Sequence, residues 1–118
     1  MRQDIDWNNI REVQQEIHAW ANRTFPKRTD YGAFTKLVME EIPELIQHKK
    51  EKGVKDIGPE LADTFILLMD LAMMWGVDIP SALANKMEVN DRRMWNFDPV
   101  AGVYQHVAIK HPPVEQKE

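Results

Sequence analysis

The chain has 118 residues and a formal net charge of −4, with 43% hydrophobic and 29% charged residues. This length predicts one domain over residues 1–118, with a flexible tail from about residue 110. The acidic balance argues against nucleic acid as a partner, and the absence of cysteine excludes disulfides and thiolate metal sites. Because no signal-like start and no apolar run of bilayer length is present, we expect a cytoplasmic protein with no membrane partner.

The first predicted helix covers about residues 7–21. Ile10 and Ile17 recur at helical spacing on its apolar side, and Glu16 belongs to the polar side. The polar residues 22–30 that follow predict a loop.

The second predicted helix runs from about residue 31 to 52 and stops at Gly53. Pro43 lies inside it, where proline removes a backbone hydrogen bond. Either the helix begins near Pro43, or it is continuous and bends at this point, which would free the carbonyl of Met39. We expect the continuous helix with a bend.

The third predicted helix starts at Pro59 and ends near Trp75. It is apolar nearly all round, so we expect it to be the central and most buried element. A fourth helix is predicted over residues 80–95, and residues 103–109 form a short extra element with no assigned place. The fold class is therefore all-α, a four-helix antiparallel bundle.

Carboxylates stand three residues apart in two motifs, Glu40-Glu41-x-x-Glu44 and Glu60-x-x-Asp63. This spacing places each pair on one helical face, and a divalent cation is the simplest compensation for such charges beside apolar surface. Fifteen residues separate Glu44 from Glu60, enough for antiparallel helices to gather both pairs around Mg²⁺ or Mn²⁺. Three roles are open for Glu40: it is exposed to solvent, it orients a water molecule, or it holds a second ion.

Lys86, Asn90 and Arg93 lie at i, i+4 and i+7, on one face of the fourth predicted helix. A point charge, an amide and a guanidinium fork in a row suit a polyphosphate chain. By spacing alone, however, a solvated polar face is the more common explanation.

These motifs, in this order, resemble those of the MazG-type, all-α nucleoside triphosphate pyrophosphohydrolases. The similar segments are Glu40-Glu41-Ile42-Pro43-Glu44-Leu45, then Glu60-Leu61-Ala62-Asp63, then Lys86 to Trp95. The resemblance covers about residues 31–95, and residues 70–76 with the closing Arg93-x-Trp95 are most similar to a phage-associated dATP/dGTP diphosphohydrolase branch.

The resemblance implies hydrolysis of a (deoxy)nucleoside triphosphate to the monophosphate and diphosphate, with a leaning to dGTP and dATP. It implies that Glu41, Glu44, Glu60 and Asp63 are catalytic residues that bind Mg²⁺. Mn²⁺ is expected to substitute for Mg²⁺. The resemblance also implies that Lys86, Asn90 and Arg93 bind the triphosphate. A homodimer or homotetramer in the cytoplasm of a bacterium, or of a phage-infected host, is expected.

The position of the base is left open by the sequence. Asp70 lies seven residues after Asp63 on the same face, about 10 Å along the axis, so it either reaches the nucleoside or pairs with a basic residue of another helix. We expect Trp20 and Phe65 in the core, and a surface or hydrogen-bonded role for His18 rather than a catalytic one. The aromatic and histidine candidates for base contact are Trp7, His18, Trp20, Phe25, Tyr31, Phe34 and Trp75.

Two alternatives remain. The same helices would also suit a non-enzymatic regulatory or partner-binding protein, which would not need both the carboxylates and the basic triad. A di-iron bundle normally needs a histidine three residues after a glutamate, and no histidine follows Glu40, Glu41, Glu44 or Glu60 at that spacing.

Overall fold

The computed structural model describes residues 4–109 and separates into two compact units, Met1–Pro80 and Ser81–Glu118. The predicted tail from about residue 110 lies outside the described residues, and the single-domain organisation stays a prediction.

Helix α1 spans Ile10–Thr24, three residues later than predicted. The shift has a local cause, because the side chain of Asn9 accepts a hydrogen bond from the Glu12 amide and caps the first turn. Ile17 is buried as expected, but Glu16 is buried as well, so its assignment to the polar face was wrong.

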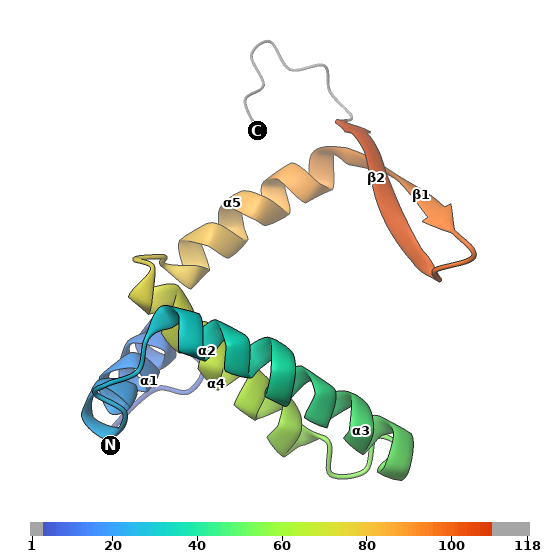
Figure 1. Ribbon diagram of the computed structural model, residues 1–118. Coiled ribbons are helices and arrows are strands. Elements are labelled where there is room, and N and C mark those ends of the chain that lie inside the picture. Colours follow the sequence, from blue (N-terminus) through green and yellow to red (C-terminus); the bar gives the residue numbers. More distant parts are fainter. Residues whose placement is uncertain (1–3, 110–118) are drawn as a thin grey trace. The chain divides into compact units, whose positions relative to one another are not determined.

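The second helix is continuous, as expected, and consists of α2 (Asp30–Lys36), η1 (Leu37–Glu41) and α3 (Ile42–Lys52) (Figure 1). The middle segment is a π-helical turn, in which the amide of Ile42 bonds to the carbonyl of Leu37. Pro43, which has no amide hydrogen, follows directly. The helix therefore passes the proline by taking in one wider turn at the acidic motif.

Helix α4 spans Gly58–Met74 and runs antiparallel to this second helix (Figure 1). At one end, Gly53 closes α3 with a positive φ of 68° and starts the short turn into α4. At the other end, the indole nitrogen of Trp75 donates to a carboxylate oxygen of Asp30 at 2.9 Å. These two connections bring the acidic motifs of the two helices to the same region.

Helix α4 is much less buried in the single chain than its composition predicts. Its buried residues are Asp70, Leu71 and Ala72, all in the last two turns. Phe65 is 56% exposed, so its predicted place in the core is wrong for one chain. The apolar surface that the sequence assigned to an internal core instead faces outward from this unit.

The second unit holds most of α5 (Ile79–Arg92) and a hairpin of β1 (Arg93–Asp98) and β2 (Val103–Ile109). The prediction of a helix through Trp95 was wrong, because Trp95 lies in β1 opposite His106. The unassigned segment 103–109 is the second, antiparallel strand. The all-α class and its four main helices are confirmed, with this hairpin added.

Within residues 4–109, no single helix has the length and apolarity needed to cross a bilayer; α4 and α5 meet the test only when they are taken together as a bent pair.

Candidate metal and nucleotide site

The four predicted metal ligands lie on helices that pack against each other, since η1 and α3 both contact α4. Glu41 ends η1 and is buried, and Glu44 lies exposed in the first turn of α3. Glu60 is half-buried in the first turn of α4, and Asp63 is exposed one turn later. Both motifs therefore stand on neighbouring, antiparallel stretches of helix.

The donor type fits a hard divalent cation, because carboxylate oxygens are the ligands that Mg²⁺ and Mn²⁺ prefer. As the side chains stand, however, no group of three or more His, Asp or Glu within residues 4–109 is gathered closely enough to hold an ion. The backbone thus brings the two motifs to one region, and the side chains are not drawn together. The ligand assignment remains a prediction.

Lys36 occupies the space beside the first motif. Its Nζ lies 3.0 Å from Oε1 of Glu40 and 3.3 Å from Oε2 of Glu41. Hydrogen bonds to Glu40 and then to Glu41 raise the pKa of Lys36. The Glu41 side chain is only 10% exposed, whereas that of Glu40 is 58% exposed, which agrees with the exposed option for Glu40.

The predicted phosphate-binding residues belong to the second unit. Lys86 is exposed on α5, and Asn90 lies half-buried near its end. Arg93 is not on the helix as predicted, because the helix ends at Arg92 and Arg93 begins β1. Its guanidinium nevertheless donates to Oδ1 of Asn90 at 3.2 Å. The two residues therefore act as neighbours despite the break in the helix.

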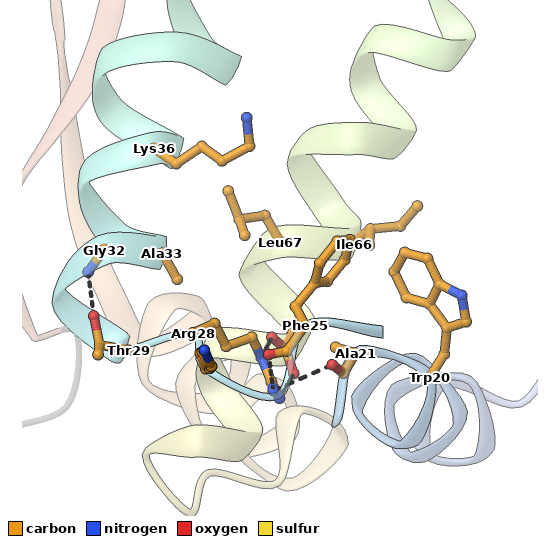
Figure 2. Close-up of a pocket in the computed structure, with 12 residues that line it drawn as sticks. Trp20, Ala21, Phe25, Arg28, Thr29, Gly32, Ala33, Lys36, Ile66 and Leu67 are labelled. Carbon is orange, nitrogen blue, oxygen red and sulfur yellow. Dashed lines mark hydrogen bonds and ion pairs between the residues drawn. The ribbon is translucent and has the colours of Figure 1, made fainter. Parts of the chain in front are cut away.

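A pocket of about 480 Å³ opens in the first unit among the end of α1, the following loop, α2 and α4. Figure 2 shows Trp20 at one side of the pocket and the α2 residues at the other, with Phe25 and the α4 residues Ile66 and Leu67 between them. Trp20 and Phe25 meet edge to face, with ring centroids 5.3 Å apart. The lining is completed by the residues Ala21, Lys27, Arg28, Thr29, Gly32, Ala33, Lys36 and Asp70.

A buried ion cluster lies at one side of this pocket. Arg28 donates to Asp70 through Nε at 2.7 Å and Nη2 at 2.9 Å, and Nδ1 of His18 lies 2.8 Å from Oδ1 of Asp70. Burial alone would raise the pKa of Asp70, but these hydrogen bonds outweigh it and lower that pKa. Of the two roles open for Asp70, the structure thus shows the paired one, although its basic partner lies in the loop before α2 and not on a helix. Of the two roles expected for His18, the structure shows the hydrogen-bonded one.

Arg28 also ties down the loop that forms this wall. Its Nη1 donates to the carbonyls of Ala21 and Phe25, and its Nη2 donates to Oδ1 of Asn22. Because its donors are already used, this guanidinium is a structural part of the pocket wall rather than a group available to a ligand.

The other aromatic candidates do not line this pocket. Tyr31, Phe34 and Trp75 surround a smaller hollow of about 240 Å³ with Asp30. The hydrogen bond from the Trp75 indole, followed by that from the Tyr31 amide, lowers the pKa of Asp30. Trp7 is 59% exposed.

Two residues that shape the region, Arg28 and Lys36, were not singled out by the sequence pattern. A signal existed for Lys36, which stands four residues before Glu40 at ion-pair spacing. None existed for Arg28, whose partner Asp70 is 42 residues away.

No family model matches the chain, but two curated phage proteins are similar to it. It is 45% identical over 98 residues to a dATP/dGTP diphosphohydrolase of Salmonella phage PMBT28, covering 83% of this chain and 31% of that protein. The chain thus spans about a third of that relative's length. It is 38% identical over 86 residues to the dATP/dGTP diphosphohydrolase of Cyanophage S-2L, covering 73% and 77% of the two proteins.

A solved structure agrees. The Cyanophage S-2L MazG-like pyrophosphohydrolase, bound to dGDP and three catalytic Mn²⁺ ions per active site, has a TM-score of 0.72 and 33% identity to this chain. The match covers 87% of this chain and 98% of that one. Together with the motif order and the helix pair that carries the carboxylates, these relationships show that the chain belongs to the MazG-like pyrophosphohydrolase family, in its branch of phage dATP/dGTP diphosphohydrolases.

Proposed function

We propose that this protein hydrolyses deoxynucleoside triphosphates to the monophosphate and diphosphate with divalent cations, and that its substrates are dATP and dGTP. The observation that carries the proposal is the pairing of two carboxylate motifs on packed antiparallel helices, in a chain related to enzymes with this named activity. The Mn²⁺ of the structural relative supports a divalent cation here, with Mg²⁺ as the expected alternative.

Glu41, Glu44, Glu60 and Asp63 are the groups we assign to hold the cations. Bound cations would neutralise charge on the phosphates and make a bound water more acidic. The chain's own part is to fix these carboxylates on two rigid helices. The oxygen of the water attacks the α-phosphorus, and the bond between that phosphorus and the oxygen that bridges it to the β-phosphorus breaks. The bridging oxygen then leaves as part of the diphosphate.

Lys86, Asn90 and Arg93 are the groups we assign to the phosphate chain. An ammonium and a guanidinium favour phosphate oxygens, and the Arg93–Asn90 hydrogen bond holds the fork in place. The two groups of site residues belong to different units.

For the base, we propose the pocket that holds Trp20 and Phe25. Its walls are mainly apolar and aromatic, which suits a stacked purine, and it adjoins the first acidic motif through Lys36. Its volume of about 480 Å³ lies in the range of small-molecule sites.

A homodimer or homotetramer is the proposed assembly. On α4, Leu61, Phe65 and Leu68 recur at helical spacing and are 41%, 56% and 43% exposed. Across the helix pair, Val38 and Ile42 add a second exposed apolar stripe. Two helices that leave such stripes uncovered form half of a four-helix bundle, and a second copy of the pair completes it.

The test is a panel of the common deoxy- and ribonucleoside triphosphates with Mg²⁺ or Mn²⁺, following monophosphate and diphosphate separately. Release of diphosphate from dATP and dGTP, lost in Glu41→Gln and Asp63→Asn, is the expected result. Glu51→Gln, an exposed glutamate of α3 that accepts a hydrogen bond from Gln47, is the matched control and keeps full activity. If no triphosphate is consumed while a protein partner binds tightly, the non-enzymatic alternative is correct.

A further inference from the structure

Lys36 joins two places that the proposed function treats separately. Its ammonium lies 3.0 Å from Glu40 and 3.3 Å from Glu41, a proposed cation ligand. The same side chain lines the pocket that holds Trp20 and Phe25, and Figure 2 shows it across that pocket from Trp20. A single flexible cation thus stands between the acidic motif and the proposed nucleoside pocket.

The π-helical turn η1 is what allows Lys36 to hold both glutamates. Lys36 and Glu40 are four residues apart and would be neighbours on any α-helix. Lys36 and Glu41 are five apart, a spacing that a regular α-helix does not bring together. The hydrogen bond from the Ile42 amide to the Leu37 carbonyl widens the turn, and with it Glu41 falls within reach of the same ammonium.

Glu41 needs compensation when no cation is bound, because its side chain is only 10% exposed. Lys36 supplies it at low cost, since its own side chain is 52% exposed and its four-carbon stem is free to turn. An ion pair of this kind is weak enough to be exchanged. A dication on the same carboxylate would repel the ammonium.

The pocket gives the displaced ammonium a place to go. Two other cationic side chains line the pocket, Arg28 and the exposed Lys27. Arg28 is already committed to Asp70, to two oxygens at the end of α1 and to the carbonyl of Phe25. Lys36 can therefore meet the phosphate of a nucleotide whose base occupies the pocket.

We propose that Lys36 is a positioning residue that exchanges partners: it balances Glu41 in the cation-free protein, gives up that carboxylate to the incoming cation, and turns to a phosphate of the nucleotide. This inference rests on the proposed function. It predicts that cation binding and nucleotide binding are coupled through this side chain. Removing the side chain should therefore raise the affinity for the cation and lower the affinity for the nucleotide.

The test is isothermal titration of Mn²⁺ into the cation-free protein, followed by titration of dGDP at saturating Mn²⁺. In Lys36→Met, we expect Mn²⁺ to bind about two- to five-fold more tightly, because the competing ammonium is gone. We expect dGDP to bind about tenfold more weakly, because a charged contact to phosphate is lost. Lys36→Arg keeps the charge and should restore both affinities to within about twofold of the wild type.

Lys49→Met is the matched control for net charge. Lys49 is an exposed lysine about 20 Å further along the same helical path, and its loss should change neither affinity. The proposal is overturned if Lys36→Met binds Mn²⁺ no more tightly than the wild type, or binds dGDP equally well. If the wild type binds Mn²⁺ and releases diphosphate, and Lys36→Met has the same two affinities as the wild type, only this inference fails and the proposed function stands. A wild type that binds no Mn²⁺ overturns both.

Discussion

Replacing Asp70 by asparagine removes the charge from a buried carboxylate that has three nitrogen atoms as close neighbours. The side chain is 4% exposed and lies within 2.9 Å of two guanidinium nitrogens of Arg28 and the ring nitrogen of His18. Breaking a buried ion pair by removing one partner costs about 3–5 kcal/mol. The Arg28 side chain is still 15% exposed, and asparagine keeps one hydrogen-bond acceptor for it. We therefore expect a loss of unfolding free energy at the lower end of this range, about 3 kcal/mol.

For a unit of this size, a loss of about 3 kcal/mol corresponds to a fall in Tm of roughly 12 °C or more. Thermal unfolding followed by circular dichroism measures it. The chain offers a matched control in Arg11 and Asp78, a second two-bond arginine–aspartate pair, at 2.9 and 2.7 Å. Those side chains are 51% and 40% exposed, so Asp78→Asn should cost only a fraction as much. Equal losses in the two variants would refute the claim that burial decides the value of these pairs.

Three further outcomes are expected. The pKa of Asp70 is lower in the folded chain than its ordinary value of 3.8, so its contribution to the free energy of unfolding is present above that value and is lost as the pH falls through the folded pKa. The difference in unfolding free energy between the wild type and Asp70→Asn, measured by urea unfolding, should therefore shrink between about pH 5 and pH 3. A difference that grows over this range would contradict the direction of the pKa shift. Phe65→Asp places a charge on the exposed stripe of α4 and should shift the species in light scattering after size exclusion toward the monomer; an unchanged mass would place the interface elsewhere. Arg93→Gln should raise the KM for dGTP about tenfold or more while the fold is kept, and an unaltered KM would remove Arg93 from the phosphate site.

The local parts of the fold were readable from the sequence. The second helix and its passage through Pro43 follow from helical spacing and from what proline lacks, although the pattern could not say that a π-helical turn would absorb the defect. The two acidic motifs were placed correctly on antiparallel helices because the loop between them is short.

The parts that depend on distant residues were not readable. Arg28 and Asp70 meet through tertiary folding, and nothing in their local sequence marks the pair. The apolar character of α4 predicts burial but does not distinguish a core from an interface, which is why Phe65 was misplaced. The helical prediction through Trp95 relied on a spacing that continues past the true end at Arg92, while Gly102, with a φ of 72°, marks the hairpin turn.

The central claim is that the carboxylates of two packed helices together hold divalent cations. Titration of Mn²⁺ into the wild type, Glu41→Gln and Asp63→Asn, with Glu51→Gln as control, tests it most directly. We expect tight binding to the wild type and the control, and a loss of about tenfold or more in each of the other two. Wild-type Mn²⁺ affinity in both Glu41→Gln and Asp63→Asn would contradict the account.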